Sequence, residues 1–508
     1  MEYDQNHPTL ATTLNNLGSN LRNVGKHDEA QKCFERALTI QEMAYDQNHP
    51  TLATTLNNLA LNLRDLGKHD EAQKCFERAL TIQEMAYDQN HPALATTLNN
   101  LGLNLRSNLH DLGKHDEAKK YLERALTIEE KAYNQNHPKL AVPLNNLGLK
   151  LRDVGKHDEA QKCFERALAI QEMAYDQNHP ALATTFNNLG SNLHDVGKHD
   201  EAQKCFERAL TIQEMAYDQN HPTLATTLNN LGSNLRDLGK HDEAQKCFER
   251  ALTIEEMAYD QNHPALATTF NNLALNFRDV GKHDEAQKCF ERALTIEEKA
   301  YNKNHPKLAV PSNNLGLNLH SLGKHDEAQK CFKRALAIQE MAYDQNHPAL
   351  ATTFNNLALN LRDVGKHDEA QKCFERALTI EEKAYNKNHP KLAVPSNNLG
   401  LNLHSLGKHD EAQKCFKRAL AIQEMAYDQN HPALATTFNN LALILRHVGK
   451  HDEAQKCFEG ALTIQEMAYD QNHPKLATTL NNLGWNLPDV GKHEEALKCF
   501  EGALAIVN

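Results

Sequence analysis

The chain has 508 residues, of which 40% are hydrophobic and 24% are charged, and its formal net charge is −12. This balance excludes a disordered chain. An acidic total without clusters of lysine or arginine argues against binding to nucleic acid or to an anionic membrane surface. No apolar run approaches the roughly 20 residues that span a bilayer, and the start MEYDQNHPTL lacks the regions of a signal peptide. We therefore expect a cytoplasmic location.

The dipeptide His–Pro recurs along the whole chain and marks an internal repeat. Its prolines stand 42 residues apart, except for a spacing of 46 between Pro92 and Pro138. The extra residues fall in the stretch LRSNLHDLGKH of the third repeat. A fixed period of this kind is the signature of a solenoid. The spacing predicts twelve repeats, at residues 3–44, 45–86, 87–132, 133–174, 175–216, 217–258, 259–300, 301–342, 343–384, 385–426, 427–468 and 469–508.

Each repeat has the pattern of two helices, here named helix A and helix B. In the first repeat, Pro8 suits the first turn of helix A, and Gly25 ends that helix. Asp28 and Glu29 suit the positive end of helix B. The apolar positions fall at helical spacing in both helices. They are Leu10, Leu14, Leu17, Leu21 and Val24 in helix A and Ala30, Phe34, Ala37 and Leu38 in helix B. The pattern predicts an all-α solenoid.

The stretch GKHDEAQKCFERAL, residues 25–38, holds residue types found in phosphate loops, metal sites and thiol enzymes. Its start GKHDEA occurs eleven times, which is typical of a structural repeat and not of a catalytic centre. Lys26 lacks a following Ser or Thr and the upstream glycine of a phosphate loop. The cysteines stand singly, one to a repeat, without the grouping of a disulfide or zinc framework. His7 and His27 lie roughly 24 Å apart along helix A. We therefore predict no catalytic residue, no metal, no cofactor and no enzymatic activity.

The repeat resembles the tetratricopeptide repeat, a helix–turn–helix unit. Leu14, Leu17, Gly18 and Leu21 stand at its helix A signature positions, and Ala30, Phe34 and Ala37 at its helix B positions. The longer unit is similar to the repeats of kinesin light chains, which share the landmarks NNLA, GK-x-x-EA, RAL-I and HP. The resemblance implies a right-handed superhelical solenoid that docks peptide segments in a concave groove of A helices, with kinesin heavy chain as one expected partner. The heptad coiled coil of that family has no counterpart before Pro8, so we expect the motor-binding part to be lost or supplied by another chain.

The residues opposite the leucine stripe of helix A are expected to face the groove. In the first repeat these are Thr12, Asn15, Ser19 and Arg22. An asparagine pair, Asn15–Asn16 in the first repeat, recurs in every repeat, and two interpretations stay open. Its amides bind the backbone of an extended peptide, or one asparagine bonds across neighbouring A helices. The predicted peptide-binding residues are Asn15, Arg22, Asn57, Arg64, Asn99, Asn145, Asn187, Asn229, Arg236, Asn271, Arg278, Asn313, Asn355, Arg362, Asn397, Asn439, Asn481 and Trp485.

The groove positions vary along the array. The Ser19 position becomes leucine in several repeats and Trp485 in the last, and the Arg22 position becomes His194, His320 and His404. Leucines beside arginines favour a peptide with apolar or aromatic anchors flanked by acids. Prolines at 143, 311 and 395 fall inside helix A, so we expect those helices to start late or to bend. Pro488 is expected to shorten the last helix A.

Three hypotheses for function follow. The leading one is a scaffold that binds proteins or peptide segments along the groove. The second is a cargo adaptor of the kinesin light chain type. The third is a structural array that associates end to end with itself, because the final helix keeps an apolar face that includes Leu497 and Leu504.

Overall fold

The structure is a computed structural model that describes residues 7–107, 115–301, 303–385, 389–426, 429, 431–469 and 473–507. These residues form helices and turns, and no strand occurs among them. The chain divides into two compact units, Met1–Asp260 and Gln261–Asn508. Within the described ranges, no helix is long and apolar enough to cross a membrane. The expected all-α, paired-helix solenoid of twelve repeats is confirmed.

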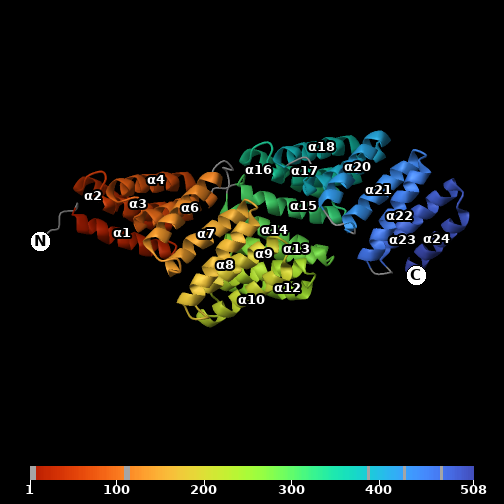
Figure 1. Ribbon diagram of the computed structural model, residues 1–508. Helices are drawn as coiled ribbons and strands as arrows, with labels where there is room; N and C mark the ends of the chain where they lie inside the picture. The colour runs from red at the N-terminus through yellow and green to blue at the C-terminus, as the bar shows by residue number, and fades with distance from the viewer. Residues whose placement is uncertain are drawn as a thin grey trace. The chain divides into compact units, whose positions relative to one another are not determined.

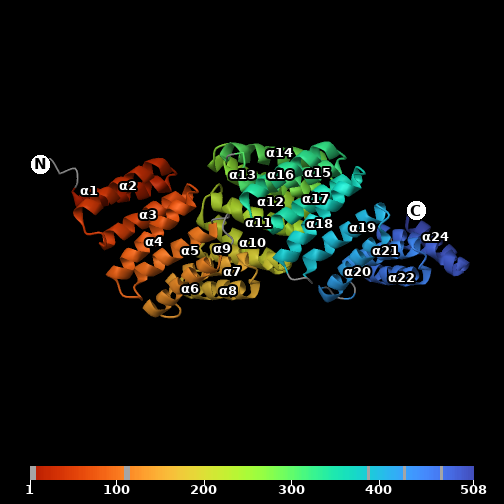
Figure 2. The same ribbon diagram turned by 90° about the horizontal axis from the view of Figure 1, so that it is seen from above.

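The first unit holds six helix pairs, each an A helix followed by a B helix. Consecutive pairs lie side by side within the unit, from α1–α2 onward (Figures 1 and 2). The helices are α1 (Pro8–Asn23), α2 (His27–Ala44), α3 (Pro50–Asp65), α4 (His69–Ala86), α5 (Pro92–Ser107), α6 (His115–Ala132), η2 (Pro138–Leu140) with α7 (Ala141–Asp153), α8 (His157–Ala174), α9 (Pro180–Asp195), α10 (His199–Ala216), α11 (Pro222–Asp237) and α12 (His241–Ala258).

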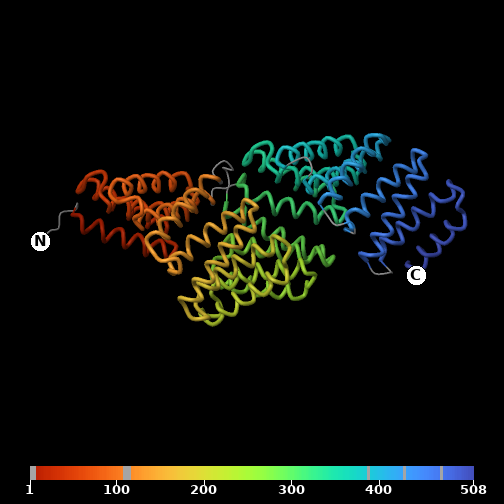
Figure 3. The backbone as a smooth tube through the Cα atoms, viewed as in Figure 1, coloured from red at the N-terminus to blue at the C-terminus, as the bar shows by residue number. Residues whose placement is uncertain are grey.

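The second unit repeats this plan, and the backbone trace shows the same up-and-down path of paired helices (Figure 3). Its helices are α13 (Pro264–Asp279), α14 (His283–Ala300), η3 (Pro306–Leu308) with α15 (Ala309–Ser321), α16 (His325–Ala342), α17 (Pro348–Asp363), α18 (His367–Ala384), η4 (Pro390–Leu392) with α19 (Ala393–Ser405), α20 (His409–Ala426), α21 (Pro432–His447), α22 (His451–Ala468), α23 (Pro474–Asn486) with η5 (Leu487–Val490) and α24 (His493–Val507).

The recurring His–Pro dipeptide starts each A helix. In α3, the Nδ1 atom of His49 accepts the backbone N–H of Thr51, and Pro50 fills the first helical position. Histidine thus takes the capping role that serine or aspartate more often fills, while proline loses no hydrogen bond there. The ring of Tyr45 stacks on His49 at 4.1 Å between ring centroids, which fixes the entry of the chain into the helix.

The recurring turn between the helices depends on a glycine with positive φ. After α3, Gly67 has φ +75°, its N–H donates to Arg64 O, and the N–H of Lys68 donates to Leu63 O. This pair of bonds closes the helix end in a Schellman motif, which needs a left-handed residue at that place. The glycine of GKHDEA is therefore a helix terminator, as predicted.

The core lies between the A and B helices of each repeat and its neighbours. Ala30, Phe34 and Ala37 of α2 are fully buried, as are most of their equivalents along each unit, whereas Phe500 of the last repeat is half-buried. A Cβ atom added at Gly18 would lie 2.8 Å from the Phe34 ring. The glycine therefore lets the two helices of the repeat approach closely, and the apolar face predicted for helix B is the core.

The predicted effect of the internal prolines is confirmed. In the repeats with Pro143, Pro311 and Pro395, helix A begins with a 3-10 turn, and its α-helical part starts two residues before the proline. Each proline then lies in the first α-helical turn, where it blocks no hydrogen bond. The last A helix ends at Asn486, ahead of Pro488. The insertion of the third repeat falls on residues 108–114, outside the described residues.

Candidate functional site: the A-helix face

The A-helix face is defined here as the positions equivalent to Thr12, Asn15, Ser19 and Arg22. In α3 they are Thr54, Asn57, Leu61 and Arg64. Thr54 is exposed, Leu61 and Arg64 are half-buried, and Asn57 is 9% exposed. The leucines on the opposite side, such as Leu52, Leu56 and Leu59, are buried as predicted, whereas Val24 at the end of the predicted stripe is 70% exposed. The outermost position of this face is therefore the threonine, which the sequence analysis placed in the groove.

The asparagine pair links neighbouring A helices. The second asparagine of one repeat donates its Nδ2 to the Oδ1 of the first asparagine in the repeat before it, at 2.8–3.2 Å. Asn58 donates to Asn15 in this way. The further bonds are Asn146 to Asn99, Asn188 to Asn145, Asn230 to Asn187, Asn314 to Asn271, Asn356 to Asn313, Asn398 to Asn355 and Asn440 to Asn397. The asparagine pair therefore forms hydrogen bonds between neighbouring A helices, which was the second of the two interpretations.

The predicted asparagines differ in burial along the array. Asn57, Asn145, Asn229 and Asn313 are buried, and Asn481 is exposed. The half-buried ones are Asn15, Asn99, Asn187, Asn271, Asn355, Asn397 and Asn439. Peptide binding by the half-buried and exposed members stays a prediction.

Several of these asparagines, with Asn57, Asn145 and Asn439 among them, donate their amide nitrogen to a threonine of the next repeat. Asn57 donates to Thr97 Oγ1 and Asn145 to Thr185 Oγ1, each at 2.7 Å. Asn439 donates to Thr479 in the same way. In the repeats that follow Asn99, Asn271 and Asn355, this threonine is replaced by Pro143, Pro311 and Pro395, which have no hydroxyl group.

Where proline replaces the threonine, the side-chain amide of the facing asparagine loses that hydroxyl as a hydrogen-bond acceptor. Among the described residues, the Nδ2 atom of Asn99 has no hydrogen-bond partner, while its Oδ1 accepts from Asn146 at 2.8 Å. An amide donor at this half-buried position can be satisfied by water or by a ligand. A peptide carbonyl is one group that fits this donor.

A cavity of about 470 Å³ lies at the same place, between α5, α6 and the start of the next A helix. Its lining includes Thr96, Asn99 and Asn100 from α5, Tyr133, and Val142 with Pro143. Val142 is 59% exposed at the threonine position of the face. The site therefore combines an apolar contact, a hydroxyl group and an amide donor.

A buried carboxyl group borders this cavity. Glu129 stands where most repeats have glutamine, and its Oε2 atom has no hydrogen-bond partner among the described residues. Burial raises the pKa of Glu129, and Lys139 opposes the rise. At the two equivalent places in the second unit, burial raises the pKa of Glu297 to about 6 and that of Glu381 to about 7.

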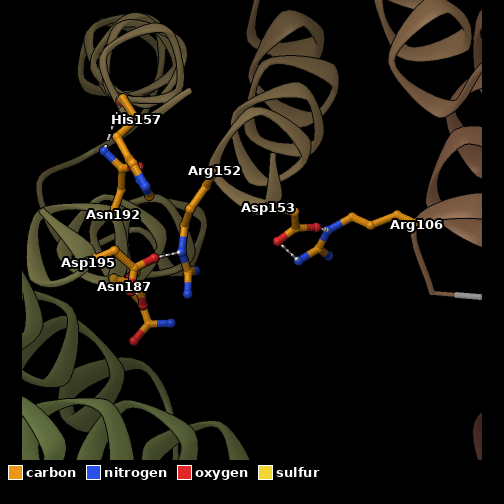
Figure 4. Close-up of polar contacts among 8 residues, drawn as sticks. Arg106, Arg152, Asp153, His157, Asn187, Asn192 and Asp195 are labelled. Atoms are coloured by element: carbon orange, nitrogen blue, oxygen red, sulfur yellow. Dashed lines mark hydrogen bonds and ion pairs between the residues drawn. The ribbon is translucent and has the colours of Figure 1, made fainter. Parts of the chain in front are cut away.

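The predicted arginines all lie next to carboxylates of the same face. Arg22 Nε is 2.6 Å from Asp65 Oδ2 in the next repeat, and Arg152 makes the same contact with Asp195 (Figure 4). Arg64, Arg236, Arg278 and Arg362 each contact the aspartate that follows them in sequence. An acidic peptide would therefore compete with these aspartates for the arginines.

A third asparagine of helix A carries a contact that sequence reasoning missed. Asn192 is fully buried, donates to the backbone oxygen of His157 at 3.1 Å, and faces its Nδ1 at 3.2 Å (Figure 4). The same pairing joins Asn62 to His27 and Asn360 to His325. The sequence signal was the recurrence of this asparagine at a position that the face pattern did not explain.

Two further features from the sequence analysis are Trp485 and the single cysteine of each repeat. Trp485 is 67% exposed and meets Phe500 edge-on at 5.6 Å between ring centroids. The eleven cysteines are free and half-buried, and burial raises the pKa of Cys163 and Cys205 to about 11. Those two thiols stay protonated at neutral pH, which is the unreactive form.

The tetratricopeptide repeat family model matches nearly the whole chain, at residues 9–70, 51–108, 107–173, 151–215, 181–257, 223–296, 265–341, 346–425 and 433–508. No curated protein matches the chain. Among solved structures, the chain is similar to a kinesin light chain-like protein of Podospora anserina with nearly identical TPR-like repeats, at 23% identity over 40% of this chain and 96% of that one, with a TM-score of 0.36. It is also similar to BtubC (BKLC) from P. vanneervenii, at 22% identity over 47% of this chain and 89% of that one, with a TM-score of 0.37.

Proposed function

The chain belongs to the tetratricopeptide repeat family, whose members are in general protein-interaction scaffolds, and on this premise we propose that it is a non-enzymatic scaffold that docks extended peptide segments on the A-helix face. The docking points are the junctions at which glutamate and proline replace glutamine and threonine. We call them Glu–Pro junctions, and they are Glu129/Pro143, Glu297/Pro311 and Glu381/Pro395.

The observation that carries this proposal is the cavity beside Asn99. At that junction an amide donor without a partner, the exposed Val142 side chain and a space of about 470 Å³ lie together. An extended peptide offers the matching groups, because its carbonyl oxygen accepts from the amide and its apolar side chains can enter the cavity and contact Val142.

The experiment selects peptides from a displayed random library on the intact chain and measures their Kd by fluorescence anisotropy. The test variant converts all three Glu–Pro junctions with E129Q, E297Q, E381Q, P143T, P311T and P395T. Glutamine and threonine already occur at these positions in other repeats, so the variant is expected to fold, which circular dichroism checks. We expect at least about tenfold weaker binding, corresponding to about one lost hydrogen bond and its packing. Equal Kd values for both chains would contradict the proposal.

A narrower proposal is that the docked segments are cargo and that the chain works as an adaptor of the kinesin light chain type. Its support is the set of landmarks NNLA, GK-x-x-EA, RAL-I and HP in the repeats. Direct binding of purified kinesin heavy chain, measured by surface plasmon resonance, tests it. Absence of binding at micromolar concentrations would remove the adaptor role and leave peptide docking standing.

An alternative proposal is self-association through α24. On this helix Leu497 is 59% exposed and Leu504 is 61% exposed, so an apolar surface faces solvent. Leu497 replaces the glutamine of most other B helices. If the surface joins two copies, the mass measured by light scattering rises with concentration and Leu497→Gln abolishes the rise. A constant monomer mass would exclude this alternative.

A further inference from the structure

Three repeats carry histidine in place of arginine at the end of helix A, and each brings two imidazoles together across the turn. The rings of His194 and His199 are 5.2 Å apart between centroids and nearly perpendicular. Those of His320 and His325 are 5.3 Å apart in the same arrangement. The third pair is His404 with His409, at 5.2 Å.

A third group reaches each pair from the end of the next A helix. Asp237 Oδ2 lies 3.5 Å from His194 Nε2, and Asp363 Oδ2 lies 3.0 Å from His320 Nε2. In the third case the aspartate is replaced by His447, whose ring centroid is 4.2 Å from that of His409. The replacement of arginine therefore converts an ion pair between repeats into a cluster of potential metal ligands.

The first cluster is the most compact. One ligand atom each of His194, His199 and Asp237 lies within 4.8 Å of the other two. Arg236 binds Oδ1 of Asp237 at 2.8 Å and leaves Oδ2 toward the imidazoles. Binding of a tetrahedral ion at about 2 Å from each ligand would draw these three atoms closer together.

A buried amide fixes which nitrogen of each imidazole carries the proton. Asn234 donates its Nδ2 to the backbone oxygen of His199 at 2.9 Å, so its Oδ1 is the acceptor for both rings. The Nδ1 atoms of His194 and His199 lie 3.2 and 3.1 Å from that oxygen. In its neutral form, each ring held by this contact carries its proton on Nδ1 and has its lone pair on Nε2. A hydrogen bond of this kind behind a metal-binding histidine is the usual supporting contact.

A cation placed between His194 Nε2 and Asp237 Oδ2 would satisfy both atoms. In the neutral tautomer set by Asn234, His194 Nε2 and Asp237 Oδ2 are both acceptors and repel each other. We propose that His194, His199 and Asp237 bind a divalent transition metal of the zinc class, with water in the fourth position. Two imidazoles and one carboxylate are a ligand set that Zn²⁺ accepts readily. His320, His325 and Asp363 form a looser copy of the same site.

The array supplies a matched control for this proposal. One repeat earlier, Arg152 stands in place of His194, and it binds Asp195 at 2.6 Å while His157 keeps its contact with Asn192 (Figure 4). His194→Arg therefore installs an arrangement that the fold already contains. The reverse substitution, Arg152→His, completes a new cluster with His157 and Asp195.

The test is equilibrium dialysis of the full chain against Zn²⁺, with the bound metal counted by atomic emission. The background variant carries H320R and H404R, so that the two related clusters do not contribute. We expect H194R to lose one ion per chain from this background and R152H to gain one, with the helical circular dichroism unchanged. Equal metal content in the background, H194R and R152H chains would overturn the proposal, because the other histidines would then account for all binding.

Discussion

Two neighbouring junctions of the first unit differ at two positions: one has glutamine and threonine, and the other has glutamate and proline. Between repeats 4 and 5, Thr185 donates to Gln171 Oε1 at 2.8 Å and accepts from Asn145 at 2.7 Å, so three side chains satisfy one another. Between repeats 3 and 4, Glu129 and Pro143 stand at the same positions, and this network is absent among the described residues. Hydrogen bonds between side chains close the A-helix face at the first junction, and the cavity of about 440 Å³ between these repeats is lined instead by Glu172, Leu182 and Arg208. At the second junction the cavity borders Asn99 and Glu129, whose polar atoms are available.

The difference teaches that identical folds can carry distinct local chemistry. Helix A is one continuous helix at the closed junction and begins with a 3-10 turn at the open one. Proline removes the hydroxyl group that would occupy the asparagine amide, and glutamate replaces a neutral partner with a group that is costly to bury when charged. The stability lost at such a junction is consistent with a binding role.

The largest expected effect comes from opening the closed junction. Thr185→Pro removes the hydroxyl of the network and places proline within α9. We expect a loss of about 3 kcal/mol, reduced to the extent that the helix restarts near Ala183, as α7 does at Ala141. Thermal unfolding measures the loss, and hydrogen exchange of the α9 amides locates the new helix start.

The matched control is Thr184→Val, because valine already occupies that position at Val142. It is expected to leave the melting temperature nearly unchanged. Equal melting temperatures for T185P and T184V would show that the network does not stabilise the closed junction.

An intermediate effect is expected from Asn192→Ala at the closed junction. The substitution leaves the buried His157 carbonyl without its donor at a site that is 0% exposed. Loss of such a partner costs about 1–3 kcal/mol. Urea denaturation of the full chain measures it, with Asn188→Ala, a half-buried member of the asparagine pair, as the comparison. A smaller loss for N192A than for N188A would contradict the assigned role of the buried amide.

A further effect is the pH dependence of stability expected at the Glu–Pro junctions. Burial raises the pKa of Glu381 to about 7, well above its value of roughly 4.3 in an unfolded chain. The folded state then binds more protons than the unfolded state between these values, so stability falls as the pH rises through this window. Glu381→Gln removes this dependence and is expected to raise the melting temperature at pH 8.

At pH 4 the carboxyl group is largely protonated in both states, so E381Q is expected to leave the melting temperature nearly unchanged there. Gln423→Glu places a carboxyl group at an equivalent position that has glutamine. It should introduce the dependence that E381Q removes, so the melting temperature of this variant should fall as the pH rises. A rise in melting temperature for E381Q that is the same at both pH values would show that the carboxyl group does not titrate in this window.

The sequence was sufficient for the features that depend on local geometry. The leucine stripe, Gly25 as the helix terminator and the late start caused by Pro143 follow from helical spacing and backbone restrictions alone. The histidine cap was not predicted, because the capping preference favours other residues.

Features that join different repeats were harder to derive. The contact between Asn192 and His157 depends on how far one A helix is shifted against the preceding B helix, which the period does not specify. The His194–His199 pair was missed for a related reason. Each histidine was compared along a single helix, whereas the Gly197 turn brings the two rings together.

The proposal that peptides dock at the open junctions is tested most directly by photo-crosslinking. A photoreactive phenylalanine replaces Val142 in one chain and Met173 in another, and both positions are exposed, at 59% and 71%. Val142 lies on the A-helix face at the open junction, whereas Met173 lies near the end of the B helix α8. The proposal predicts that a peptide selected on the intact chain crosslinks at position 142 and not at position 173. Crosslinking at 173 alone would contradict it.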